Sequence, residues 1–139
     1  ETIMVKKSFT IPDSEWRSQL TPEQFRVCRL KETELPFSGS LYYCQDQGLY
    51  LCVCCSNKLF SSNEKFESGS GWPSFWEPHS DDCVRYETDD SHGMRRVEVL
   101  CNNCDSHLGH MFDDGPQPSG KRYCINSVSL TFNKLDPTT

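Results

Sequence analysis

Two cysteine pairs with identical spacing constrain the fold of this 139-residue chain more than any other feature. Cys52 and Cys55 form one CxxC pair, and Cys101 and Cys104 form the other. Each pair can make a tight knuckle that presents two thiolates, and four thiolates are a typical ligand set for a tetrahedral zinc ion. The sequence therefore predicts one zinc ion bound by these four cysteines.

The separation of the two pairs indicates what the metal does. Forty-five residues lie between Cys55 and Cys101, whereas a self-contained zinc ribbon has about 15–20 between its pairs. The ion would therefore join two distant hairpins, and four sulfur ligands leave no position for water or substrate, so we expect a structural zinc. Two alternatives stay open: redox CxxC motifs, which no βαβ pattern supports, and Cys54 in place of one ligand.

The remainder of the chain predicts short N-terminal helices followed by a mainly β domain. Helical spacing of apolar residues begins near Pro12 and again near Thr21, where Thr21 to Gln24 has the form of a capping box. Beyond Gly39 this period ends, and short alternating stretches between turn residues predict antiparallel strands. The predicted strands are 48–53, 58–60, 95–101 and 123–132, and the polar stretch 77–93 is predicted to be a surface loop.

Length and composition limit the organisation of the chain and its partners. The length suits one domain over 12–133, with an N-terminal extension over 1–11 and a tail over 134–139. The net charge is -6, with 14 lysines and arginines against 20 aspartates and glutamates, so we expect no nucleic acid partner. No apolar run approaches the about 20 residues that cross a bilayer, so we expect a soluble protein with no membrane partner.

The cysteine count bears on the compartment. Nine cysteines are an odd number, which argues against a complete set of internal disulfides and favours metal binding or chemistry in a reducing environment. We therefore expect an intracellular location, cytoplasmic or mitochondrial, and a removed transit peptide stays open. Nothing in the sequence requires more than a monomer.

Cys124 is the cysteine whose surroundings suggest chemistry. If 122–132 form one strand, Arg122, Cys124 and Asn126 lie on one face, which begins polar and ends apolar. The polar end would open onto a site, where positive charge and hydrogen-bond donors favour a reactive thiolate with a lowered pKa. The alternative is a structural cysteine at the end of a strand.

Two further stretches suggest the walls of such a site. Two glycines precede Trp72-Pro73, so this loop can hold an indole at a cleft, although Phe75 and Trp76 can also fill the core beneath a turn. His107 and His110 follow the second cysteine pair on a segment that the metal would make rigid. Because four thiolates already satisfy the ion, we expect these histidines to donate protons or hydrogen bonds.

Several motifs together carry a resemblance to a known family. The chain contains GWPSF, HLGHMFDDGP and RYCINS in this order, with the paired CxxC motifs and an earlier VCRLKETELPFSG. This combination closely resembles the type B methionine sulfoxide reductases over about Trp16 to Phe132. The resemblance implies two antiparallel sheets, as a β-sandwich or open barrel around the zinc site, with small N-terminal helices. It also implies reduction of methionine-R-sulfoxide in oxidised proteins or peptides, for protein repair and defence against oxidative stress.

The resemblance assigns roles to individual residues. Cys124 matches the catalytic cysteine, which attacks the sulfoxide sulfur and becomes a sulfenic acid. Trp72 matches the indole that receives the methyl group of the substrate. The residues near the sulfoxide oxygen would be His107, His110 and Asn126, with His110 as the proton donor, and Arg122 and Asp114 would have supporting roles.

One position departs from the family pattern. Many members have a cysteine that forms a disulfide with the catalytic one where this chain has Ser70. Either Cys28 or Cys44 takes this resolving role, with Cys83 as a third candidate, or an external thiol such as thioredoxin reduces the sulfenic acid directly. We expect Cys28 and Cys44 in loops or frayed strands, where they can move.

Two other functions compete with the reductase. One is a noncatalytic β module stapled by zinc that binds a protein partner, and the other is a zinc ribbon that binds nucleic acid. Neither of these two functions requires Cys124, Trp72 or His110.

Overall fold

The structure is a computed structural model that describes residues 12–134. The predicted extension over 1–11, and the tail beyond residue 134, lie outside these residues. The helices are α2 (Asp13–Gln19) and α3 (Pro22–Cys28), with 3-10 turns η1 (Ser40–Tyr43), η2 (Ser62–Glu64), η3 (Ser91–Gly93) and η4 (Ser127–Ser129). The strands are β1 (Gly48–Cys52), β2 (Lys58–Ser61), β3 (Lys65–Phe66), β4 (Ser74–Phe75), β5 (Val84–Asp89), β6 (Arg96–Cys101), β7 (His107–Phe112), β8 (Arg122–Ile125) and β9 (Leu130–Lys134).

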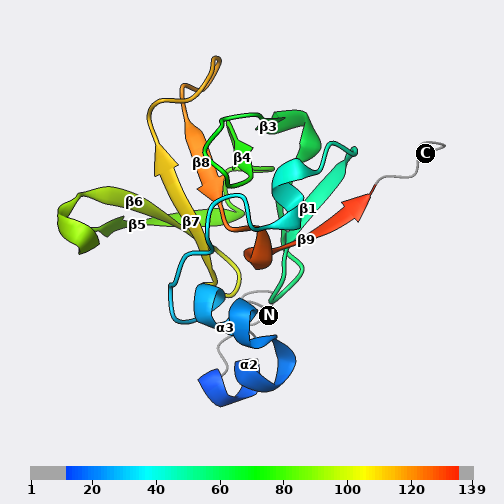
Figure 1. Cartoon of the computed structure of the whole chain (residues 1–139), viewed down its shortest axis with the longest axis vertical. Helices are drawn as coiled ribbons and strands as arrows, with labels where there is room; N and C mark the ends of the chain where they lie inside the picture. Colours follow the sequence, from blue (N-terminus) through cyan, green and yellow to red (C-terminus); the bar gives the residue numbers. More distant parts are fainter. Residues whose placement is uncertain (1–11, 135–139) are drawn as a thin grey trace.

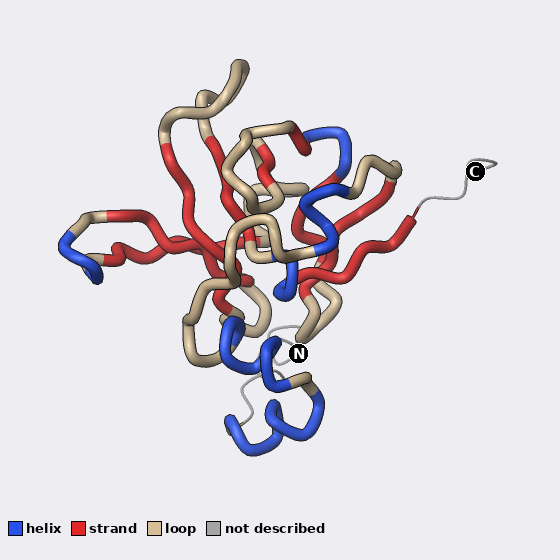
Figure 2. Tube along the Cα trace, in the orientation of Figure 1, coloured by secondary structure: helices blue, strands red, loops and turns tan. Residues whose placement is uncertain are grey.

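The strands form two antiparallel sheets, as predicted (Figure 1). One sheet has the order β2-β1-β9, and the other has the order β3-β4-β8-β7-β6-β5. In Figure 2 the helices α2 and α3 lie together below both groups of strands. Within the described part of the chain, no helix combines the length and the apolar composition needed to cross a bilayer.

The prediction of a single strand over 123–132 was wrong. The turn η4 divides it, so that β8 belongs to the larger sheet and β9 to the smaller one. The cause is Glu34, whose carboxylate accepts hydrogen bonds from the backbone N–H groups of Ser127 (2.9 Å) and Val128 (3.0 Å). These bonds stabilise the first residues of a turn in place of a continuous ladder.

The predicted surface loop over 77–93 was also wrong in part, because β5 lies within it. This strand pairs with β6 along six residues, from Val84 opposite Cys101 to Asp89 opposite Arg96. It is an edge strand, and its central residues are exposed. A strand with so few buried positions lacks the apolar alternation by which strands are recognised.

The second helix begins as its sequence predicted. The Thr21 hydroxyl accepts from the backbone N–H of Gln24 (3.1 Å), and the Gln24 side chain accepts from the backbone N–H of Thr21 (2.9 Å). This helix contacts η4 and β7 and buries Phe25. Cys28 is its last residue and is 2% exposed, so the expectation of a mobile loop there was wrong.

An aromatic core joins the two sheets. Phe60 of the smaller sheet stacks on Phe75 of the larger one, with ring centroids 4.4 Å apart, and Tyr50 meets Phe75 edge-on at 5.1 Å. Phe75 is therefore a core residue. Tyr123 also packs on Phe60, and this orients the neighbouring Cys124 to the opposite face of β8.

Candidate active site and metal centre

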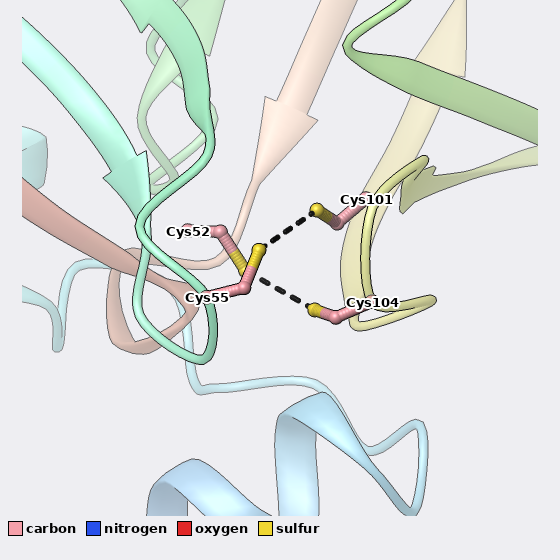
Figure 3. Close-up of side chains that lie close together, drawn as sticks. All are labelled: Cys52, Cys55, Cys101 and Cys104. Carbon is pink, nitrogen blue, oxygen red and sulfur yellow. Dashed lines mark hydrogen bonds between the residues drawn. The ribbon is translucent and has the colours of Figure 1, made fainter. Parts of the chain in front are cut away.

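The four paired cysteines converge between the sheets (Figure 3). Cys52 and Cys55 belong to the β1–β2 hairpin, and Cys101 and Cys104 belong to the β6–β7 hairpin. Their sulfur atoms lie within 4.8 Å of one another, and the Cys52–Cys104 and Cys55–Cys101 pairs are each 3.6 Å apart. Zinc–sulfur bonds of about 2.3 Å at tetrahedral angles place two sulfurs about 3.8 Å apart. The cluster therefore fits a metal ion, and it links two hairpins as predicted.

The two hairpins present their sulfurs with the same backbone turn. The N–H of Ser56 donates to the carbonyl of Cys52 (2.8 Å), and the N–H of Asp105 donates to the carbonyl of Cys101 (2.9 Å). Ser56 and Asp105 follow the second cysteine of each pair and both take positive φ, at 67° and 65°. Each knuckle is thus closed by one left-handed residue, which aims both thiols to the same side.

Amide side chains approach the cluster from outside. Asn103 Nδ2 lies 3.5 Å from the sulfur of Cys55, and Asn57 Nδ2 lies 3.7 Å from the sulfur of Cys101. Such donors stabilise thiolate charge and orient the ligands. Cys54 is not part of the group of four and lies 4.0 Å from a guanidinium nitrogen of Arg29.

Cys124 lies on β8 at the wall of a cavity of about 400 Å³. Its cross-strand partners are Ser74 on β4 and His110 on β7, so these side chains leave the sheet on one face. Trp72 and Asn126 line the same cavity. The structure thus brings together four of the predicted site residues, which come from three separate parts of the sequence.

The surroundings of Cys124 contain one hydroxyl and one cation. The Ser70 hydroxyl and Arg122 Nη1 each lie 3.5 Å from its sulfur. Burial raises the pKa of the Cys124 thiol, and the opposing effects of Ser70 and Arg122 do not offset it. The expectation of a lowered pKa was therefore wrong, because the side chain is more deeply enclosed than the polar start of the strand suggested.

Arg122 is held in place beside the thiol by a carboxylate. Its Nε and Nη2 donate to the two oxygens of Asp114 at 2.9 and 3.1 Å, and its guanidinium lies 4.4 Å from the ring centroid of Phe112. These contacts fix the guanidinium, and the supporting roles expected of Arg122 and Asp114 stay a prediction.

Trp72 is fixed at the cavity by a residue that the sequence motifs did not single out. Its indole Nε1 donates to the backbone carbonyl of Glu34 (3.0 Å), while the backbone N–H of Glu34 donates to Asn126 Oδ1 (3.0 Å). Glu34 is 4% exposed, and its carboxylate also binds the start of η4. The only signal in the sequence was its place in the segment ETELPFSG, which belonged to the resemblance.

The two histidines reach the same face because β7 contains a bulge. Val99 pairs with Gly109 and Leu100 pairs with His107, so Leu108 is an extra residue on β7. The bulge cancels the alternation that would otherwise send His107 and His110 to opposite faces, and their rings lie 5.6 Å apart.

Each histidine contacts one carboxylate. His107 Nδ1 lies 2.7 Å from Glu98 Oε2, and His110 Nε2 lies 2.7 Å from Asp89 Oδ2. Burial lowers the pKa of His110, and the Asp89 carboxylate opposes this without reversing it. His110 lines the cavity of Cys124, whereas His107 is 2% exposed and lines a neighbouring cavity of about 370 Å³.

Asn126 is held at both ends of its amide. Its Nδ2 donates to the carbonyl of the bulged Leu108 (3.0 Å), and its Oδ1 accepts from Glu34. The side chain is 3% exposed and lines the cavity with a fixed orientation. One of its two amide hydrogens has no partner in these bonds and can be given to a ligand.

The candidate resolving cysteines lie elsewhere. Cys28 contacts the Ser129 hydroxyl at 3.6 Å, and Cys44 follows η1. Neither residue, nor Cys83, is among those that line the cavity of Cys124. A resolving role for any of them stays a prediction.

Comparison of the sequence with known proteins finds relatives along nearly the whole chain. The SelR domain family matches residues 20–134. A peptide methionine sulfoxide reductase MsrB of Methanosarcina mazei is 54% identical, with 97% of this chain and 96% of the relative covered. MsrB proteins of Hahella chejuensis (56% identical, 95% and 92% covered) and Leptospira interrogans (57%, 88% and 93%) are similarly related.

A solved structure supports the fold independently. The crystal structure of the Mis18 'Yippee-like' domain superposes with a TM-score of 0.53 at 17% identity, covering 65% of this chain and 98% of that domain. This likeness concerns the fold alone, whereas the matches along the sequence include the residues of the cavity. The chain belongs to the SelR domain family of MsrB methionine sulfoxide reductases.

Proposed function

We propose that this chain reduces methionine-R-sulfoxide in oxidised proteins or peptides, with Cys124 as the nucleophile. The observation that supports this most is the placement of Cys124 opposite His110 in a cavity that Trp72 also lines. A sulfoxide has an electrophilic sulfur, a basic oxygen and a methyl group. The cavity offers a thiol, a titratable ring and an indole for these three parts.

The reaction follows from these placements. The Cys124 sulfur attacks the sulfoxide sulfur, and His110 delivers a proton to the oxygen, with Asn126 beside it as a hydrogen-bond donor. The oxygen ends on Cys124 as a sulfenic acid, so the cysteine sulfur is oxidised by two electrons and the methionine sulfur is reduced by two. His107 supports His110 from the neighbouring cavity.

Recycling of Cys124 requires thiols. A thioredoxin-like or other thiol reductant displaces the oxygen as water and forms a mixed disulfide, which a second thiol then reduces. Cys28 or Cys44 would replace the first external thiol only after a rearrangement, because neither lines the cavity of Cys124 and Cys28 is also buried within α3.

The metal centre has a separate role in this proposal. Cys52, Cys55, Cys101 and Cys104 would hold one zinc ion, and a closed set of four thiolates supplies cross-linking and no open coordination position.

Turnover of the two epimers tests the proposal. A peptide with methionine-R-sulfoxide and its S epimer are incubated with dithiothreitol and either the protein or Cys124→Ser. We expect reduction of the R epimer only, and loss of this activity in Cys124→Ser by at least about 1,000-fold, because a hydroxyl is a far weaker nucleophile. If the folded protein reduces neither epimer, the catalytic proposal fails.

A further inference from the structure

Asp89 is the carboxylate that contacts His110, and the reaction above assigns it no part. Its Oδ2 lies 2.7 Å from His110 Nε2 and 3.3 Å from Arg96 Nη2. Its Oδ1 accepts from the backbone N–H of Ser91 at 2.9 Å and from the Ser91 hydroxyl at 2.6 Å. Contacts to both oxygens therefore fix this carboxylate, which lies at the end of β5, on the opposite side of β7 from β8.

The contact with Asp89 determines which ring nitrogen of His110 carries the proton. Hydrogen bonds from Ser91 and from His110 hold the pKa of Asp89 well below its usual range, so the carboxylate is ionised and can only accept. Nε2 must then be the donor. Because burial lowers the pKa of His110, the ring is neutral near pH 7, and Nδ1 carries a free lone pair.

The sheet places His110 next to the residue that carries the thiol. His110 and Cys124 are directly opposite one another on β7 and β8, and cross-strand partners have Cβ atoms about 4.5–5.5 Å apart. Both line the cavity of about 400 Å³. The resting thiol is protonated, so a base at this position is what the first step requires.

We propose that Asp89 is a positioning residue, which keeps the His110 proton on Nε2 so that Nδ1 can accept the proton of the Cys124 thiol and pass it to the sulfoxide oxygen. This inference rests on the proposed function. The S–H bond breaks as an Nδ1–H bond forms, and the carboxylate stabilises the imidazolium. The same proton then moves to the oxygen, and His110 is neutral again when Cys124 carries the sulfenic acid.

Other charges around His110 do not replace Asp89. Arg96 and His107 lower the pKa of His110, whereas the Asp89 carboxylate raises it. Glu98, the cross-strand partner of His110 on β6, is already paired with His107 and Lys31. The charged and titratable groups that line the two cavities with His110 are Lys31, Glu87, Asp89, Asp90, Arg96, Glu98, His107, Arg122 and Cys124.

The variant Asp89→Asn tests this role. The amide keeps an oxygen for Ser91 but removes the charge and can donate to Nε2, which favours the tautomer with the proton on Nδ1. We expect kcat for the R epimer to fall about 100-fold or more at pH 7. Nitrogen-15 NMR of the imidazoles should show the proton move from Nε2 to Nδ1. The His110 pKa and the acidic limb of the pH–rate profile should both move to lower pH, since the carboxylate that raises this pKa is gone.

Two further variants separate positioning from folding. Asp89→Glu retains a carboxylate and should recover part of the rate and the Nε2–H tautomer. Asp90→Asn removes the neighbouring charge, which pairs with Arg95 at 3.2 Å on the surface, and should leave rate and tautomer unchanged.

An unchanged rate, tautomer and pH profile in Asp89→Asn would overturn the inference while the reductase proposal stands. If Asp89→Asn does not fold, the wild-type spectrum decides, because a neutral His110 with its proton on Nδ1 refutes the inference. If the wild type reduces neither epimer, the proposed function fails, and the NMR result still tests the link between Asp89 and His110.

Discussion

At the scale of single residues, the position of Ser70 has the clearest consequence. Its hydroxyl lies 3.5 Å from the Cys124 sulfur and 2.8 Å from the Ser68 hydroxyl, with which it shares a hydrogen bond. A thiol at this position would meet Cys124 at close range. The departure from the family pattern therefore removes a disulfide partner but leaves the local geometry for one intact.

The substitution Ser70→Cys should restore this disulfide. Bonded cysteines have Cβ atoms about 3.8 Å apart, which small side-chain rotations can reach from the present contact. After one equivalent of sulfoxide, peptide mapping should find the introduced thiol bonded to Cys124. In the wild type, a sulfenic acid reagent should label Cys124 instead.

The matched control for this substitution is Ser68→Cys. Ser68 belongs to the same hydroxyl network through Ser70 and Ser74, whereas the hydroxyl bonded to the Cys124 sulfur is that of Ser70. Ser68→Cys should give no such disulfide. A Ser70→Cys protein that accumulates sulfenic acid as the wild type does would show that the loop does not let the two sulfurs meet.

At the scale of elements, features set by residues close in sequence could be predicted, whereas a turn and a bulge set by distant contacts could not. The capping box of α3 and the CxxC knuckles involve residues three positions apart, so the sequence alone predicts them. The division of 123–132 depends on Glu34, which bonds Ser127 from 93 positions away. The bulge in β7 likewise depends on its register with β6. No periodicity within one segment can report such contacts.

The residues of the candidate site also fall into two groups, those that a sequence motif marks and those that only the folded chain brings to the site. Cys124 and Trp72 carry motifs and could be predicted, and His110 could be chosen from its place after the second cysteine pair. Asp89 and Glu34 could not, because a polar edge strand and a chain segment far from the site supply them. The raised pKa of Cys124 could not be predicted from the sequence, because burial causes it and burial is a property of the folded chain.

Gly109 sets the spacing between β7 and β8. A Cβ at this position would lie 2.0 Å from the backbone carbonyl oxygen of Cys124, so the strands pair closely only with glycine here. Gly109→Ala should destabilise the protein by about 1–3 kcal/mol through overpacking. It should also lower turnover, because His110 and Cys124 lie on the strands that must separate. Urea unfolding and R-epimer turnover measure the two effects.

A glycine in open surroundings provides the comparison for Gly109. Gly93 has φ of 71°, and a Cβ at this position would have no neighbouring atom within 4 Å. The Cβ of Gly93→Asn therefore lies in open space, and Asn tolerates this backbone conformation. Its stability and turnover should stay close to the wild type. Equal losses in Gly93→Asn and Gly109→Ala would mean that strand spacing is not the cause.

At the scale of the whole molecule, the metal centre and the active site are coupled through β7. Cys104 precedes His107 by three residues, and the strand then carries His110 to the cavity. The two sheets otherwise meet through the aromatic core and the turn η4. A metal bound by the four cysteines would therefore anchor the start of the strand that carries His110, and its loss should affect packing before it affects any chemical step.

Removal of zinc should therefore unfold the domain. Structural zinc sites contribute about 10–16 kcal/mol of apparent binding energy at pH 7, against the about 5–15 kcal/mol by which typical domains are stable. We expect one zinc per chain by elemental analysis, and loss of the near-UV dichroism after chelation or in Cys101→Ser. Cys44→Ser, which changes a thiol outside the cluster, should retain the metal and the spectrum. A chelated protein that keeps its native spectrum and its thermal midpoint would show that the core and η4 hold the sheets together without the metal.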